Sequence, residues 1–297
     1  MAETAPEVSI VVPTQGERLS LIPALRSALA QDFPSLEVVV VDDSPTGNLG
    51  QRFPELANLL ADARVRVVPF REGRGCAAAK NAGWRAARGQ WLCYLDDDNE
   101  YAPGKVSRQH ALAAANGSPL VTCGLEIRAG PRHRLRQTAA ADFSGDQLLL
   151  DVVADTNVIF HRRDVGVAWN EGLGTVDDAC LFQAIVEYYD LQTVPNVAEA
   201  LVVYHAHAGA RANRELRRFY RGQRHLLVRW TRRYSPRARR VLLLRSLIAF
   251  SKYRSGRWFE LCRCSCALMR LAGWREWRVG VNALGVKTPI LRRWMVT

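Results

Sequence analysis

The chain has 297 residues, of which 48% are hydrophobic and 24% are charged, and this composition excludes a largely disordered protein. The net charge is +12, and the seven scattered cysteines favour reduced thiols in the cytoplasm over a disulfide framework. The first residues lack the features of a secretory signal, and the apolar segment 241–250 is interrupted by Arg245, so we expect no membrane-spanning helix.

Charge divides the chain into two parts. Residues 211–297 contain 23 Lys and Arg and three Glu, a balance of +20, which leaves −8 for residues 1–210. Five of the eight tryptophans also lie in the basic part. We therefore predict two regions with different roles, a catalytic domain over residues 1–210 and a basic, Trp-rich helical region over residues 211–297.

Apolar runs and amphipathic segments alternate through the first third of the chain. β-branched runs such as Val8–Val12 are typical of buried strands, and segments with apolar residues every three to four positions are typical of helices. The expected strands are 8–12, 36–41, 65–70 and 91–95, and the expected helices are 19–31, 48–61 and 77–88. This alternation predicts an α/β fold with a doubly wound, mostly parallel sheet, whose ligands bind beyond the carboxyl ends of the strands.

A polar cluster follows each expected strand. The clusters are Pro13-Thr14, Asp42-Asp43, residues 71–75 and Asp96-Asp97-Asp98. Turn chemistry explains glycine, proline and serine at such places, but it explains repeated carboxylates poorly, because they are costly to bury and rare in strands. In an extended chain Asp96 and Asp98 lie on one face and can hold a hard cation, while Asp97 points away.

The turn after the third strand also fits a rival pattern. Residues 73–78, Gly-Arg-Gly-Cys-Ala-Ala, match the degenerate G-x-G-x-x-A fingerprint of dinucleotide-binding enzymes, which would make the protein an oxidoreductase. That fingerprint belongs after the first strand of its fold, and clustered aspartates beside a pyrophosphate give it no advantage. We therefore treat this as the weaker interpretation.

Four motifs resemble, in order, those of family 2 glycosyltransferases with the GT-A fold. The first strand ends in a turn containing Pro13, and the second ends in Val41-Asp42-Asp43-Ser44. A Gly-rich turn leads to Lys80-Asn81-Ala82-Gly83, where the family has Arg-Asn-x-Gly, and the fourth strand ends in Leu95-Asp96-Asp97-Asp98. Each motif alone is common, but together at this spacing they are specific. The resemblance implies a metal-dependent, inverting hexosyltransferase that uses a nucleotide diphosphate sugar, with UDP-sugars favoured.

The resemblance also implies roles for individual residues. The nucleotide would be lined by Pro13, Thr14, Glu17, Asp42 and Asp43, and the donor-binding set would further include Gly75, Lys80, Asp96 and Asp97. Asp96 and Asp98 would bind Mg²⁺ or Mn²⁺, which stabilises the charge on a leaving diphosphate. Lys80 keeps the charge of the family's arginine but loses its bidentate geometry at phosphate.

Acidic residues open a helix later in the same domain. Residues 155–163 resemble the family's strand before the acceptor-side helix, and Asp177-Asp178 stand where the family has Glu-Asp. The resemblance makes Asp178 the catalytic base, whereas the alternative is simple helix capping, because Asp at a helix start is stabilised by free N–H groups. His205 and His207 share one face of a strand end. The resemblance favours His207 as a ligand to metal or phosphate. The alternative is that this histidine is simply solvated and has no such role.

The basic region lies outside the resemblance. Its pattern predicts three amphipathic helices, 214–233, 236–254 and 258–271, and we interpret Cys262, Cys264 and Cys266 as small core residues. The charge would suit a nucleic-acid-binding protein, but the region contains no module of that kind. We expect a cytoplasmic protein whose tail docks on the inner face of an anionic membrane, holds a phosphate-bearing or lipid-linked acceptor, or covers the body as a basic surface.

Overall fold

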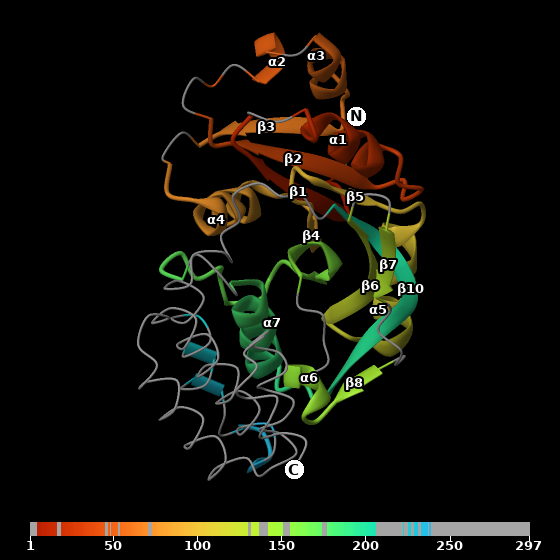
Figure 1. Cartoon of the computed structure of the whole chain (residues 1–297), viewed down its shortest axis with the longest axis vertical. Helices are drawn as coiled ribbons and strands as arrows, with labels where there is room; N and C mark the ends of the chain where they lie inside the picture. Colours follow the sequence, from red (N-terminus) through yellow and green to blue (C-terminus); the bar gives the residue numbers. More distant parts are fainter. Residues whose placement is uncertain are drawn as a thin grey trace, which may run out of the picture. The chain divides into compact units, whose positions relative to one another are not determined.

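The computed structural model describes residues 5–16, 19–44, 47, 49–52, 54–70, 73–129, 132–136, 142–150, 155–173 and 177–205, with scattered positions from 222 to 238. The chain forms two compact units, residues 1–209 and 210–297. The elements below belong to the first unit (Figure 1). The helices expected at 214–233, 236–254 and 258–271, with their three cysteines, fall almost entirely outside the described residues.

In the described residues, the first unit contains ten strands with helices between them. The strands are β1 (Val8–Thr14), β2 (Leu36–Asp42), β3 (Val65–Pro69), β4 (Trp91–Tyr94), β5 (Asn99–Tyr101), β6 (Leu120–Ala129), β7 (Arg132–Arg136), β8 (Asp142–Ser144), β9 (Phe160–Arg162) and β10 (Thr193–His205). The helices are α1 (Leu21–Leu29), α2 (Leu49–Arg52), α3 (Pro54–Leu60), α4 (Cys76–Ala86), α5 (Lys105–Asn116), α6 (Gln147–Leu150), the 3-10 helix η1 (Thr156–Val158) and α7 (Asp177–Tyr188). Among the helices described, none has the length and apolar character needed to cross a lipid bilayer.

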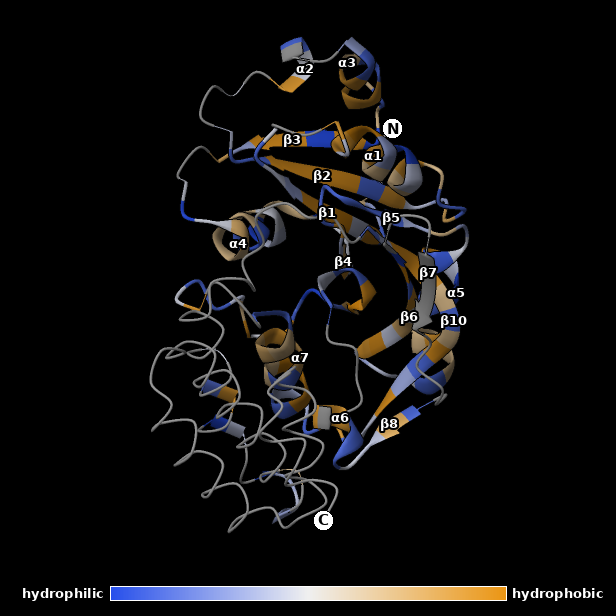
Figure 2. Ribbon diagram, viewed as in Figure 1, coloured by the Kyte–Doolittle hydropathy of each residue, from blue (hydrophilic) through white to orange (hydrophobic). Residues whose placement is uncertain are grey.

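The sheet has the strand order β3-β2-β1-β4-β9-β6-β10-β5. Strands β1 to β4 pair in parallel, as the alternating pattern predicts, so their carboxyl ends meet at one edge. Beyond β4 the sheet is mixed, because β9 runs antiparallel to both β4 and β6. The predicted α/β class is therefore confirmed. The predicted parallel arrangement holds for the half of the sheet that carries the motifs, and the other half is mixed. Figure 2 shows β1 and β2 as hydrophobic strands, and every residue of both is buried.

One expected helix is divided in two. The segment 48–61 forms α2 and α3 instead of a single helix, and α3 begins at Pro54. Proline is tolerated at the first position of a helix, where its missing N–H has no partner to lose, but it breaks a helix interior. The polar pattern of this segment thus located helical structure correctly and missed the break.

Helix α4 packs very closely on the parallel strands. Its buried side includes the small residues Ala77, Ala78, Ala79, Ala82 and Gly83. A Cβ atom on Gly83 would lie 2.3 Å from Val11 Cγ1 and 2.9 Å from Val41 Cγ2, so only glycine fits this contact. This packing fixes α4 on the sheet, and the polar side chains on its other side contact the polypeptide beyond residue 155.

Candidate active site

The ends of β1, β2 and β4 are joined by hydrogen bonds. The hydroxyl of Thr14 donates to Asp97 Oδ2 at 2.7 Å, and the N–H of Asp43 donates to the carbonyl of Thr14 at 2.8 Å. Thr14, Asp42 and Asp43 are all buried. Three of the four polar clusters predicted from the sequence therefore meet at the carboxyl edge of the parallel strands, as expected for a common site. Asp97, predicted to point away from Asp96 and Asp98, turns toward β1.

The two aspartates after β2 organise the loops around them. Asp42 Oδ1 accepts a hydrogen bond from the N–H of Ser44 at 3.0 Å, and Asp43 Oδ1 accepts one from the N–H of Gly73 at 2.9 Å. Gly73 has φ of 59°, a conformation that favours glycine. The Gly-rich turn is therefore tied to β2 from the edge strand β3, a position that does not fit the rival dinucleotide fingerprint.

A cavity of about 520 Å³ opens beside Asp42. It lies between α2, α3 and β3, and its lining includes Gly47, Gly50, Ala57 and Val67. Most of the lining is small or apolar, with Asp42 and Gln51 as polar residues, and such walls suit a flat organic group that carries an N–H donor.

Lys80 occupies the centre of the acidic residues. Its ammonium lies 3.1 Å from Asp96 Oδ1, donates to Thr156 Oγ1 at 2.8 Å, and stands 4.5 Å from the centre of the Trp169 ring. Burial opposes its charge, but the charges of Asp96 and Asp177 outweigh that effect, so the pKa of Lys80 is well above its usual value. The cation that the motif assigns to the diphosphate is thus buried and paired with Asp96.

Asn157 of η1 holds the backbone around Asp96. Its Oδ1 accepts from the N–H of Asp96 at 2.8 Å, and its Nδ2 donates to Asp155 Oδ1 at 2.7 Å. Burial and then the charge of Asp96 raise the pKa of Asp155. Neither Asn157 nor Thr156 was singled out from the sequence, because their partners are more than 60 residues away. The available signal was the segment 155–163, which resembles the family's strand before the acceptor-side helix and contains both residues.

The acidic pair expected on the acceptor side opens α7. The helix begins at Asp177, and Asp178 Oδ1 accepts from the N–H of Ala179 at 2.7 Å, in agreement with the capping alternative. Burial first, and then the charges of Asp177 and Asp155, raise the pKa of Asp178 well above the usual value for aspartate. A carboxylate held in this way has an increased affinity for protons, so capping and proton transfer are compatible in one residue.

Asp96 and Asp98 are the two carboxylates that the resemblance assigns to a divalent cation. Asp96 Oδ1 is buried without a hydrogen bond, so the Lys80 ion pair compensates its charge, and Asp98 follows two positions later. In the part of the chain that is described, no cluster of three or more His, Cys, Asp or Glu could hold a metal ion. Further ligands would have to come from water or a bound diphosphate. Glu17 and His207 lie outside the described residues, and His205 contacts Glu100 at 2.7 Å.

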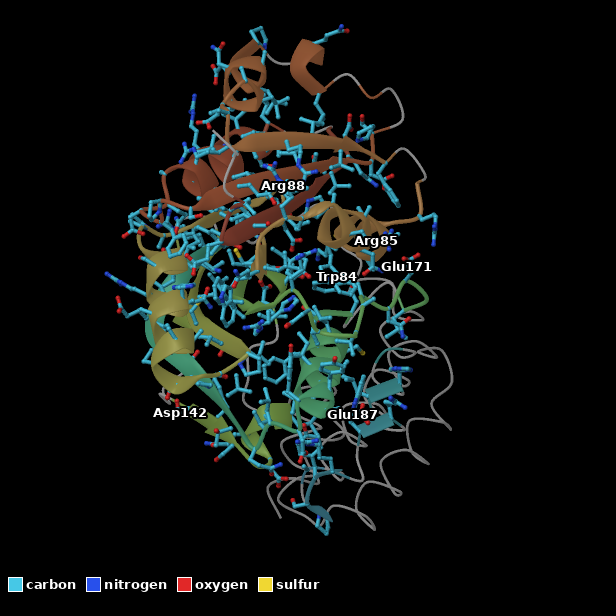
Figure 3. All side chains as sticks on the ribbon, turned by 180° about the vertical axis from the view of Figure 1, so that it is seen from behind. Trp84, Arg85, Arg88, Asp142, Glu171 and Glu187 are labelled. Atoms are coloured by element: carbon cyan, nitrogen blue, oxygen red, sulfur yellow. The ribbon has the colours of Figure 1, made fainter. Side chains whose placement is uncertain are left out.

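Asn81, next to Lys80, fastens the loop that precedes α7. Its Nδ2 donates to the carbonyl of Trp169 at 3.0 Å and to Glu171 Oε1 at 2.9 Å, while its Oδ1 accepts from the N–H of Trp169 at 2.9 Å. The other oxygen of Glu171 is paired with Arg74. Figure 3 labels Glu171 close to α4, the helix that carries Asn81. Asn81 and Glu171 are therefore two site residues without a predicted role.

A protein-family model described as Glycosyl transferase family 2 matches residues 9–174. The succinoglycan biosynthesis protein ExoO of Rhizobium meliloti (strain 1021) is 33% identical over 162 residues, which are 54% of this chain and 45% of ExoO. The Escherichia coli UDP-Glc:alpha-D-GlcNAc-diphosphoundecaprenol beta-1,3-glucosyltransferase WfaP is 26% identical over 102 residues, 34% of this chain and 39% of WfaP. The chain thus spans less than half the length of these two relatives.

Solved structures of S. aureus TarS share the fold. The crystal structure of TarS 1–349 in complex with UDP-GlcNAc superposes with a TM-score of 0.66 over 89% of this chain and 80% of the TarS chain, at 18% sequence identity. TarS 1–349 has also been solved in complex with UDP, and it covers 86% of this chain with a TM-score of 0.62. At this level of identity the likeness establishes the architecture, and it confirms the predicted fold class.

Proposed function

The chain belongs to glycosyl transferase family 2, as its motifs predicted, and from that premise we propose that it moves a hexosyl group from a nucleotide diphosphate sugar to a hydroxyl acceptor. We further propose that the reaction inverts the anomeric carbon and requires Mg²⁺ or Mn²⁺. The observation that carries the proposal is the buried ion pair of Lys80 with Asp96 at the end of β4, together with the effect of Asp177, at the start of α7, on the pKa of the same ammonium group. A metal-assisted leaving group and a proton acceptor need such a pair of acidic positions.

The donor would lie along the carboxyl edge of the parallel strands. The cavity beside Asp42 supports a place for the base, and the Gly-rich turn held by Asp43 leads from there toward Lys80 and Asp96. We favour uracil as the base, because the structure of TarS carries UDP-GlcNAc and the name of WfaP specifies UDP-Glc. Asp96 and Asp98 would hold the divalent ion, which supplies Lewis-acid stabilisation of the leaving diphosphate.

Asp178 would act as the base. The acceptor oxygen attacks the anomeric carbon, and its proton passes to the Asp178 carboxylate. The bond from that carbon to the diphosphate oxygen breaks, and the electron pair leaves with the nucleoside diphosphate. The raised pKa of Asp178 supports this role, because a base is most effective when its pKa approaches the working pH. Lys80 would keep Asp96 oriented through their ion pair.

Two substitutions test the two halves of the proposal. Asp98→Ala should remain folded and lose Mn²⁺-dependent affinity for UDP in isothermal titration, because a carboxylate ligand is gone. Asp178→Asn should bind UDP normally and lose roughly 10² to 10⁴-fold in the rate of UDP release from a UDP-sugar. Unchanged UDP affinity in Asp98→Ala would refute the metal site. If Asp177→Asn loses the rate of UDP release and Asp178→Asn keeps it, the catalytic base is Asp177.

The donor itself can be found by thermal shift. A nucleotide sugar that binds only the folded protein raises its melting temperature by mass action. UDP-glucose and UDP-N-acetylglucosamine, each with Mn²⁺, are the first to test, and GDP-mannose provides a control with another base. A rise with GDP-mannose alone would refute the uracil assignment while leaving sugar transfer in place.

We also propose that the basic region serves a phosphate-bearing or lipid-linked acceptor at an anionic membrane surface. The support is its balance of +20 with five tryptophans, and the lipid diphosphate in the name of the relative WfaP. Each basic residue near an anionic surface contributes about 1 kcal/mol, so a few suffice for reversible docking. The protein should sediment at low salt with anionic vesicles and remain in solution with neutral ones. Equal failure to bind both kinds of vesicle would refute docking.

A further inference from the structure

The loop at residues 169–173 is held by one buried amide. Asn81 is 3% exposed, and both hydrogens of its Nδ2 are used, one by the carbonyl of Trp169 and the other by Glu171. Its Oδ1 accepts from the N–H of Trp169, so the same side chain pairs with both backbone groups of one residue. An asparagine amide can donate and accept in this way, which an aliphatic or charged side chain cannot.

Glu171 extends this contact to the Gly-rich turn. One of its oxygens accepts from Asn81 and the other pairs with Arg74, whose side chain is 56% exposed. Arg74 stands between Gly73 and Gly75, which have φ of 59° and 95°. Residues in such a turn are poorly fixed by their own backbone preferences. Asp43 already holds the turn through the N–H of Gly73, and Glu171 adds a second contact through Arg74. Glu171 thus joins a turn tied to β2 with a helix fixed on the sheet.

The same loop leads to the acidic pair of α7. Glu171 precedes Asp177 by six positions, and the intervening Leu173 is buried. The charge of Asp177, at the start of α7, also raises the pKa of Lys80 on α4. Because Asp178 follows Glu171 by only seven positions, we expect a displacement of the loop to move Asp178 as well. Reactions of this kind are sensitive to such changes, since a misplacement of about 1 Å costs on the order of 10²-fold in rate.

We propose that Glu171 is a positioning residue that sets the distance between the donor side of the site and Asp178. Asn81 anchors it to the sheet through α4, and Arg74 extends it to the turn after β3. The proposal rests on the proposed function, in which Asp178 takes the proton. It predicts that loss of Glu171 slows the chemical step and leaves the affinity for the donor unchanged.

The first experiment compares Glu171→Ala with Glu171→Gln. The probe is UDP release from UDP-glucose or UDP-N-acetylglucosamine with Mn²⁺, with water as the acceptor. Glu171→Ala loses both contacts and should lower kcat by about 10- to 100-fold, with the Kd for UDP within about twofold. Glu171→Gln keeps an oxygen for Asn81 and should recover part of kcat. Glu187→Gln, an exposed residue far along α7 in Figure 3, is the control and should match the unmodified protein.

The second experiment asks whether Glu171 acts through Asp178. In the Asp178→Asn background, Glu171→Ala should cause no further loss of the residual rate, because the group that it positions is already gone. Equal losses in both backgrounds, or a kcat for folded Glu171→Ala within about twofold of the unmodified protein, would overturn the inference. Full activity of Asp178→Asn would instead refute the proposed base, and the inference would fail with it, whereas a harmless Glu171→Ala leaves the base intact.

Discussion

Acid should destabilise the first unit through a single buried histidine. His161 on β9 is 1% exposed, and its Nδ1 lies 2.7 Å from the carbonyl of Arg162. A carbonyl only accepts, so Nδ1 carries the hydrogen and Nε2 accepts from the Tyr94 hydroxyl at 3.1 Å. Tyr94 is the last residue of β4, and its ring contacts Trp169 edge to face. A second proton on His161 would therefore disturb the strand that carries the aspartates.

The magnitude follows from the pKa of His161. Burial lowers it from 6.5 to about 4. Because the folded-state pKa is the lower one, the unfolded chain binds more protons between these values, and stability falls as the pH is lowered through them. At 1.36 kcal/mol for each pKa unit, the shift corresponds to about 3 kcal/mol lost between pH 6.5 and pH 4. Carboxylates with raised pKa values, such as Asp178, change stability in the opposite direction, so a variant is needed to isolate the histidine.

Urea unfolding of the unmodified protein and of His161→Gln, at several values from about pH 7 to 4.5, provides that comparison. The stability advantage of the unmodified protein should shrink as the pH falls. The NMR signal of the His161 imidazole can be assigned as the one that is absent from the spectrum of His161→Gln. In the unmodified protein this signal should keep the chemical shift of a neutral imidazole at about pH 5.5. A difference in stability that does not change with pH, or a resonance that titrates near pH 6.5, would refute the reasoning.

Two further substitutions should change the stability of the folded protein in a direction that the structure predicts. Gly83→Ala should cost about 1–3 kcal/mol in urea unfolding, because the new methyl group would meet Val11 and Val41, whereas Gly50→Ala has room and should cost little; equal effects would contradict the close contact. Asp178→Asn should raise the melting temperature at pH 7, since the ionised form is the disfavoured one, and the gain should shrink as the pH falls toward the usual pKa of aspartate. The exposed Asp142→Asn serves as its control, and a gain that is the same at every pH would argue against ionisation as the cause.

The parallel half of the sheet was predictable because its strands are short β-branched runs with polar ends. Val8–Val12 shows this pattern, and β1 is buried throughout. The motif spacing was equally informative, since the parallel register brings Thr14 and Asp97 into contact across 83 positions. By contrast, the mixed half rests on β9 and β5, strands of three residues each, which have too few positions for a periodic pattern to be recognised.

The side-chain contacts within the site could not be predicted from the sequence. The motif at Lys80 predicts a cation, but its partners Asp96 and Thr156 depend on how α4 packs on the sheet. Asn81 illustrates the same limit, because nothing near it in the chain indicates a bond to Trp169. Local patterns report which face of an element is buried, whereas these contacts join elements that are far apart in the chain.

The buried ion pair of Lys80 with Asp96 affects the stability of the protein when no metal is bound. A cluster of carboxylates without an internal cation repels itself, which destabilises the folded state when no metal is bound. Here the ammonium group of Lys80, a residue of α4, lies beside the carboxylates whether or not a metal is bound. The folded state of the first unit therefore does not require a divalent ion to offset this repulsion. We expect the protein to stay folded, without the activity proposed for it, when Mg²⁺ or Mn²⁺ is withdrawn.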